Sequence, residues 1–135
     1  MQMIEEMTSL DIHRAYTNLF ENKVLFNKIA EGTAIPDSFE AIRKDTLSAL
    51  YNSIVRYEDA PGLLYLKGVL EGAPNLSSIK HVVIDEAQDY SPLQYEIFHQ
   101  LFGSCNMTIL GDLNQSIHPY MHTDNYNVLL DILKA

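Results

Sequence analysis

Apolar residues recur three and four positions apart through residues 1–72, and this is the spacing of amphipathic helices. A first helix is predicted within residues 1–30, where the repeating positions are Ile12, Ala15, Tyr16, Leu19 and Phe20. Gly32 and Pro36 then interrupt the pattern. A second helix is predicted by Phe39, Ile42, Leu47, Leu50, Tyr51, Ile54 and Val55. A third begins after Asp59 and Pro61 and ends near Gly72, because glycine suits a left-handed cap.

The pattern changes after a predicted loop at residues 72–78. Residues 81–84 form a short, continuous, β-branched run, and residues 107–110 form another, so each is predicted to be a buried strand. Between them, Ser91, Pro92 and Gln94 make the capping box of a helix that should use Leu93, Ile97, Phe98 and Leu101 and end at Gly103. Strand, helix, strand predicts a right-handed βαβ unit with parallel strands.

A last helix is predicted to begin near Asp124 and to run through Val128, Leu129, Ile132 and Leu133. The predicted fold class is therefore α/β, with a helical segment at residues 1–72 and a βαβ-α part at residues 73–135. The sequence has no apolar run near the length of about 18 residues that a membrane span needs. It also has no basic leader before an apolar segment, so we expect a cytoplasmic protein without membrane contact.

The charge balance limits the kind of nucleic-acid contact that this chain can make. It has 18 acidic and 9 basic residues, a net charge of −9, and no run of lysine or arginine that would form a basic stripe. Alone, the chain is expected to bind DNA weakly. Any nucleic-acid role would depend on stacking or polar groups, or on basic surface from other polypeptide.

Polar residues follow both predicted strands at the point where each strand ends. Asp85, Glu86 and Asp89 follow the first, and Asp112 and Gln115 follow the second. Parallel strands bring their carboxyl ends to one edge of a sheet, where ligands collect in open α/β folds. Nucleotide hydrolysis needs one carboxylate to organise Mg²⁺ and another to orient the attacking water, and an amide can contact the terminal phosphate. Each cluster taken alone is also compatible with a solvated turn.

These two clusters resemble motifs of a known family. Residues 82–90, which read VVIDEAQDY, resemble the Walker B motif of UvrD/Rep-type superfamily-one helicases. Residues 109–117, which read ILGDLNQSI, resemble the third motif of that family. Residues 56–66 are similar to the helicase IV and RNA-polymerase-associated HelD branch. The resemblance implies a partial RecA-like P-loop NTPase fold within the first motor domain, with ATP and Mg²⁺ as cofactors and single-stranded or duplex DNA as partner.

The same resemblance assigns roles to individual residues. Asp85 would help to hold Mg²⁺ and Glu86 would activate the water, while Gln115 would sense the γ-phosphate. Gln88 and Asp89 would tie the nucleotide site to neighbouring motor elements. The positions that contribute to the nucleotide site would be Asp85, Gln88, Asp89, Asp112 and Gln115.

Two further residues fall where family members place aromatic rings that line single-stranded DNA. They are His118 and Tyr120, of which only Tyr120 keeps a strong stacking ring. A half-buried loop tyrosine is the alternative interpretation of Tyr120. Met121 stands where an arginine is usual, so the contact through that position is in doubt.

The phosphate-binding half of a P-loop site has no counterpart in the sequence. No G-x-x-x-x-G-K-S/T pattern occurs in the 135 residues. We therefore expect an internal section of a motor domain that works with the rest of a helicase chain and is inactive alone. One alternative is an interaction module that docks onto RNA polymerase. Another is a metal-dependent hydrolase built on Asp85, Glu86, Asp89 and Asp112.

Overall fold

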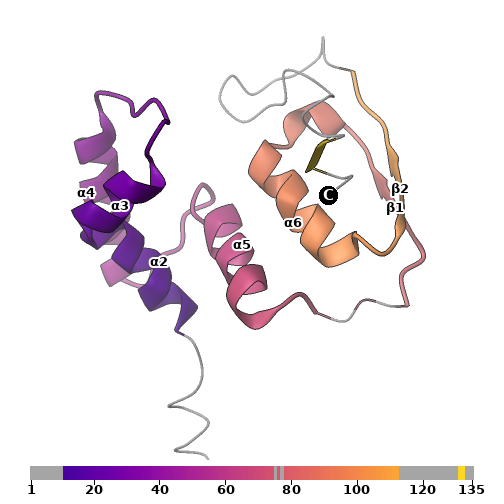
Figure 1. Ribbon diagram of the computed structural model, residues 1–135, viewed down its shortest axis with the longest axis horizontal. Helices are drawn as coiled ribbons and strands as arrows, with labels where there is room; N and C mark the ends of the chain where they lie inside the picture. The colour runs from indigo at the N-terminus through magenta and orange to yellow at the C-terminus, as the bar shows by residue number, and fades with distance from the viewer. Residues whose placement is uncertain (1–10, 75, 77, 113–130, 133–135) are drawn as a thin grey trace, which may run out of the picture. The chain divides into compact units, whose positions relative to one another are not determined.

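The computed structural model describes residues 11–74, 76, 78–112 and 131–132. It is mixed α/β, in agreement with the predicted class. Its elements are α2 (Ile12–Glu21), α3 (Lys23–Ile29), α4 (Phe39–Tyr51), α5 (Ala60–Glu71), β1 (His81–Ile84), the 3₁₀ helix η1 (Ala87–Asp89), α6 (Pro92–Phe102) and β2 (Asn106–Ile109) (Figure 1). Contacts divide the chain into two compact units, of which the first ends at Leu66 and the second begins at Lys67, inside α5. The predicted boundary after residue 72 stays a prediction.

The helix predicted within residues 1–30 is confirmed as α2, which contains all five of its named apolar positions. Asn22 ends α2, and α3 follows as a separate helix. Asn22 has an extended backbone with φ −87° and ψ 94°. Its side-chain oxygen accepts hydrogen bonds from the N–H groups of Val24 and Leu25, at 3.1 and 3.0 Å. Asparagine competes in this way with the helix for backbone partners, so one residue ends α2 and caps α3.

The second predicted helix ends earlier than the apolar pattern suggests. Ser53 takes a left-handed conformation with φ 58°. The Ile54 N–H then returns to the Ala49 carbonyl at 2.9 Å, and the Ser53 N–H returns to Leu50 at 2.9 Å. This is a Schellman-type ending, which satisfies the last carbonyls of α4. Ile54 and Val55 therefore lie beyond the helix and are exposed, which corrects the prediction that they belong to it.

A buried hydrogen bond joins α2 to the start of α5 within the first unit. The Tyr16 hydroxyl donates to Asp59 Oδ1 at 3.1 Å, and both residues are buried. Burial, together with the Asp59 carboxylate, raises the pKa of Tyr16. A Cβ at Gly62 would lie 2.8 Å from the Tyr16 ring, so glycine is required there by close packing. The third predicted helix is confirmed as α5, and Gly72 ends it with φ 86°.

In the second unit, β1 and β2 are parallel, which confirms the predicted pairing. Val82 pairs with Met107, and Ile84 pairs with Ile109. The second strand begins at Asn106, one place before the predicted start. α6 begins with the predicted capping box, in which Ser91 and Gln94 satisfy each other's backbone N–H groups. Ile84, Ala87 and Tyr95 form the buried core between the strands and α6.

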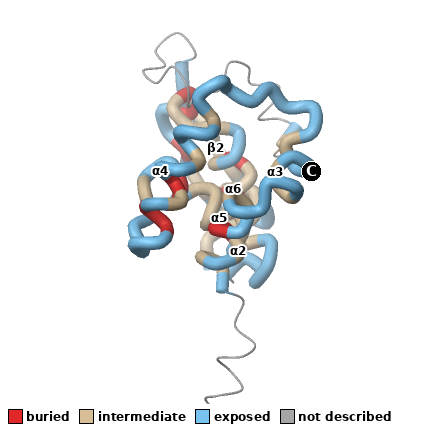
Figure 2. The backbone as a smooth tube through the Cα atoms, turned by 90° about the vertical axis from the view of Figure 1, so that its left-hand side faces the viewer, coloured by how far each residue is buried: buried red, intermediate tan, exposed pale blue. Residues whose placement is uncertain are grey.

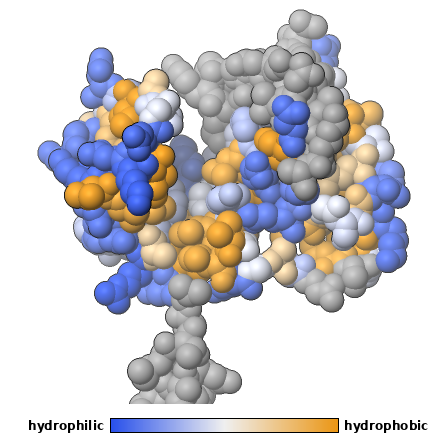
Figure 3. Space-filling model, in the orientation of Figure 1, coloured by the Kyte–Doolittle hydropathy of each residue, from blue (hydrophilic) through white to orange (hydrophobic). Residues whose placement is uncertain are grey.

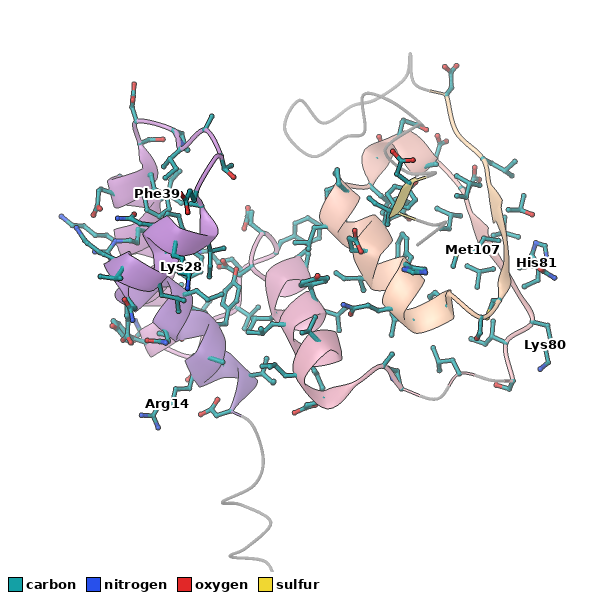
Figure 4. The ribbon with its side chains drawn as sticks, viewed as in Figure 1. Arg14, Lys28, Phe39, Lys80, His81 and Met107 are labelled. Atoms are coloured by element: carbon teal, nitrogen blue, oxygen red, sulfur yellow. The ribbon has the colours of Figure 1, made fainter. Side chains whose placement is uncertain are left out.

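The two strands, predicted to be buried, are exposed or half-buried at most of their positions. Val83 is 61% exposed, whereas Ile84 beside it is 6% exposed. His81 points away from α6, and Met107 lies on the α6 side of the strands (Figure 4). Strand side chains alternate between faces, and among the described residues a helix covers one face only. β1 therefore has an apolar side chain on an open face.

Much of the described backbone is exposed or only partly buried (Figure 2). Apolar side chains remain on the surface of both units (Figure 3). Val24, for example, is 80% exposed and Tyr57 is 73% exposed. No helix in the described ranges is long and apolar enough to cross a membrane. Of the predicted last helix, Asp131 and Ile132 are helical and the remainder lies outside the described residues.

Candidate functional site

The chain leaves β1 and β2 at the same edge of the sheet. The segments that follow the two strands, residues 85–89 and 110–112, are named the strand exits, and they remain hydrogen-bonded to each other. The Leu110 N–H donates to the Ile84 carbonyl at 2.8 Å. The Ala87 N–H then donates to the Leu110 carbonyl at 2.9 Å. The backbone pairing therefore continues past the last strand residues. Asp85 and Glu86, which follow β1, lie at the edge of the sheet from which the segment leading to Asp112 also leaves.

Glu86, two residues after the end of β1, has an unusual backbone conformation. Its φ is 50° and its ψ is 45°, in the left-handed region that residues other than glycine rarely occupy. Its N–H donates to Asp85 Oδ1 at 2.9 Å, so one carboxylate fixes the backbone of the next. Conformations of this kind cost about 1–3 kcal/mol and concentrate at functional sites. The turn leaves both carboxylate-bearing residues exposed to solvent.

Gln88 connects the two strand exits through one buried amide. Its side chain is almost fully buried, at 1% exposure. Its Oε1 accepts a hydrogen bond from the Asp112 N–H at 3.0 Å. Its Nε2 donates to Glu86 Oε2 at 2.8 Å. The amide thus satisfies a backbone donor on the β2 side and a carboxylate on the β1 side.

Gly111 makes this close approach possible. A Cβ at this position would lie 2.5 Å from Gln88 Oε1, 2.8 Å from the Ala87 nitrogen and 3.0 Å from the Ala87 Cβ. Two of these three neighbours belong to Ala87, which is fully buried and cannot retreat easily. Glycine is therefore required by space here, a role that the sequence analysis did not assign to Gly111.

Tyr95, on α6, is hydrogen-bonded to the backbone of the segment that follows β1. Its hydroxyl donates to the Ala87 carbonyl at 2.7 Å, and both residues have 0% exposure. Its ring makes edge contacts with Phe98 and Tyr90, with centroid distances of 5.7 and 6.2 Å. Sequence reasoning missed Tyr95 and placed Leu93 on the buried stripe, yet Leu93 is 38% exposed. A tyrosine in the first turns of α6, in phase with Phe98, was the available signal.

Asp89 carries an acceptor that the described chain leaves open. Its Oδ1 is buried and has no hydrogen-bond partner among the described residues. A buried carboxylate oxygen without a donor is costly, so this atom is suited to a partner supplied from elsewhere.

Three predicted site residues, namely Gln115, His118 and Tyr120, lie outside the described residues.

The carboxylates do not assemble into a metal cluster of their own. Across the described parts of the chain, no group of three or more His, Cys, Asp or Glu side chains is placed to hold a metal ion. The metal-dependent hydrolase built on Asp85, Glu86, Asp89 and Asp112 stays an alternative prediction. Oxygen ligands such as Asp85 do fit Mg²⁺, which usually takes only one or two carboxylates and completes its shell with water and phosphate oxygens.

Comparison with known proteins bears on this same part of the chain. Residues 66–132 match the UvrD/REP helicase N-terminal domain. These residues carry a UvrD-like helicase sequence. The ATP-dependent DNA helicase SRS2 of Saccharomyces cerevisiae is 37% identical over 73 residues, which cover 50% of this chain and 6% of that helicase. The chain therefore spans a small part of the length of this relative.

Proposed function

We propose that the UvrD-like segment supplies one side of the ATP-hydrolysis site of a DNA helicase motor with a RecA-like core. The observation that carries this proposal is the joint exit of two parallel strands, bridged by Gln88 between Glu86 and Asp112. Carboxyl ends of parallel strands are where nucleotides bind in open α/β sheets. The similarity to a DNA helicase supports ATP, Mg²⁺ and DNA as the ligands of the complete motor.

Within this proposal, the chain's own residues divide the work between two adjacent carboxylates. Asp85 would supply an oxygen ligand to Mg²⁺, and the bound ion would neutralise charge on the phosphates. Glu86, exposed at the tip of the turn, would accept a hydrogen bond from the attacking water and orient it. Gln115 would contact the terminal phosphate. Asp89, through its open buried oxygen, would accept a donor from a neighbouring motor element.

DNA contact is assigned to His118 and Tyr120, by stacking of their rings on bases. The net charge of −9 means that phosphate contacts would come from basic surface elsewhere in the motor. Assignment to the helicase IV and HelD branch, docking onto RNA polymerase and a cytoplasmic location stay predictions.

A segment exchange tests the proposal. Residues 66–132 would replace the matching stretch of the SRS2 helicase, and DNA-stimulated ATP hydrolysis would be measured with an ADP-release assay. In an active chimera, Glu86→Gln should lower kcat by roughly 100-fold or more, because the amide cannot take the proton or orient water as a carboxylate does. The KM for ATP should change little, since Glu86 would act mainly in the transition state.

The matched control is Glu71→Gln, which neutralises an exposed carboxylate of α5 whose partner is Lys67, 3.8 Å away. This control should retain the kcat of the parent chimera, because exposed ion pairs contribute little. If Glu86→Gln and Glu71→Gln hydrolyse ATP equally well, Glu86 is not the catalytic carboxylate and the proposal fails.

A further inference from the structure

We propose that Gln88 is a positioning residue, which orients the Glu86 carboxylate according to the backbone position of Asp112. The inference rests on the proposed function in one respect, namely that Glu86 is the carboxylate that orients water. It adds a physical connection between the two strand exits. A displacement of the segment after β2 would reach Glu86 through a single side chain.

The chemistry of the amide fixes its orientation between the two groups. Oε1 faces the Asp112 N–H and Nε2 faces the Glu86 carboxylate, at 3.0 and 2.8 Å. Rotating the amide by half a turn would set a donor against a donor and an oxygen against a carboxylate, both of which are repulsive. One arrangement is therefore strongly preferred. A side chain at this position must accept at one end and donate at the other.

Other side chains of similar size cannot satisfy both groups. Glutamate could accept from Asp112 but would repel the Glu86 carboxylate. Methionine has a similar length and no N–H to donate. Asparagine is one methylene shorter and would not span the same gap. Glutamine therefore suits the two contacts together, and Gly111 provides the space that its Oε1 occupies.

The two residues of this hydrogen bond differ in burial, so the buried Gln88 amide restricts the exposed Glu86 side chain and not the reverse. Gln88 is 1% exposed, so its amide has little freedom to reorient. Glu86, by contrast, is exposed, and its side chain would otherwise sample several rotamers in water. A donor held rigidly beside a mobile carboxylate restricts which rotamer the carboxylate adopts.

The connection can be tested by NMR on the full 135-residue chain. The Gln88 side-chain amide protons would be assigned in the wild-type chain through their scalar couplings to the Gln88 backbone, and their exchange with solvent would be measured. In Glu86→Ala these protons should exchange about tenfold faster or more, because a charge-assisted acceptor is removed. Glu86→Gln keeps a side-chain carbonyl as acceptor and should retain much of the protection. The Asp112 backbone amide should be unaffected in both variants.

The inner half of the connection is tested by Gln88→Met. There the Asp112 amide should exchange about tenfold faster, since it loses its acceptor, and the side-chain carboxyl ¹³C resonance of Glu86 should shift. Should Gln88→Met fail to fold, Glu86→Ala still decides, because that substitution removes an exposed side chain. Unchanged Gln88 exchange in Glu86→Ala would overturn the inference.

Kinetics of the active chimera then separate positioning from a structural role. Gln88→Glu keeps the acceptor for Asp112 and removes the donor to Glu86. It should therefore retain ATP binding and lower kcat by about tenfold or more, with little change in the KM for ATP. Full kcat in Gln88→Glu would overturn the positioning role. Full activity of Glu86→Gln, with the NMR contacts confirmed, would instead reject the proposed function and leave the connection itself standing.

Discussion

Replacing Gly111 by alanine probes the closest packing in the candidate site with a single methyl group. The added Cβ would lie 2.5 Å from Gln88 Oε1 and 2.8 Å from the Ala87 nitrogen. Real Cβ atoms do not approach other heavy atoms this closely, so something must shift. The Gln88 side chain can rotate only by leaving its hydrogen bond with Asp112, and the Ala87 backbone is tied to the Leu110 carbonyl at 2.9 Å. We expect Gly111→Ala to destabilise the second unit.

The size of the effect follows from two opposing terms. Overpacking of a close-packed interior costs about 1–3 kcal/mol. Replacing glycine by alanine also restricts the unfolded chain, which offsets about 0.4–1 kcal/mol. The net loss of unfolding free energy should be about 1–2 kcal/mol. With a urea dependence of about 2 kcal/mol per molar, within the range of small proteins, the midpoint should fall by roughly 0.5–1 M.

The assay is urea unfolding followed by the NMR amide signals of β1 and β2, so that the second unit is observed separately from the first. Ser104→Ala, at an exposed position in the turn before β2, is the control and should change the unfolding free energy by less than about 0.5 kcal/mol. In a Gln88→Ala background the cost of Gly111→Ala should shrink, because one of the two closest contacts is gone, but it should not vanish while Ala87 remains. An unchanged midpoint in Gly111→Ala would refute the packing argument.

Two further predictions concern the first unit and the whole chain. Tyr16→Phe should destabilise the first unit by about 1–3 kcal/mol, since it leaves the buried Asp59 carboxylate without that hydroxyl. The pKa of Tyr16 is raised above its ordinary value of 10.0. The stabilisation by the protonated Tyr16 hydroxyl is therefore complete below about pH 10 and is lost as the pH rises through the raised pKa. Urea midpoints measured between about pH 9 and about pH 11 should therefore fall with pH less steeply in Tyr16→Phe than in the wild type, and equal slopes would contradict this. The isolated 135-residue chain should show no measurable ATP hydrolysis or unwinding, and ATP turnover that Glu86→Gln abolishes in this chain would contradict that expectation.

Features that depend on neighbouring residues were predictable from the sequence. The capping box of Ser91 and Gln94 and the left-handed ending at Gly72 each involve groups a few positions apart, so residue type alone indicates them. The break at Asn22 is also local, but the apolar periodicity continues across it and conceals it. The parallel pairing of the strands was predictable because a short helical crossover between two apolar runs permits few other arrangements.

The contacts between the segments that follow β1 and β2 could not be predicted from the sequence. Gln88 and Asp112 are far apart in sequence. Their residue types do not indicate that the buried Gln88 amide contacts both the Asp112 N–H and the Glu86 carboxylate. The requirement for glycine at position 111 cannot be seen in the sequence. It arises from Gln88 and Ala87, which folding brings close to Gly111, and not from the backbone conformation of Gly111 itself. The sequence determined which groups could perform the chemistry, since that depends on residue type. Folding determined which of them contact one another, since that depends on long-range packing.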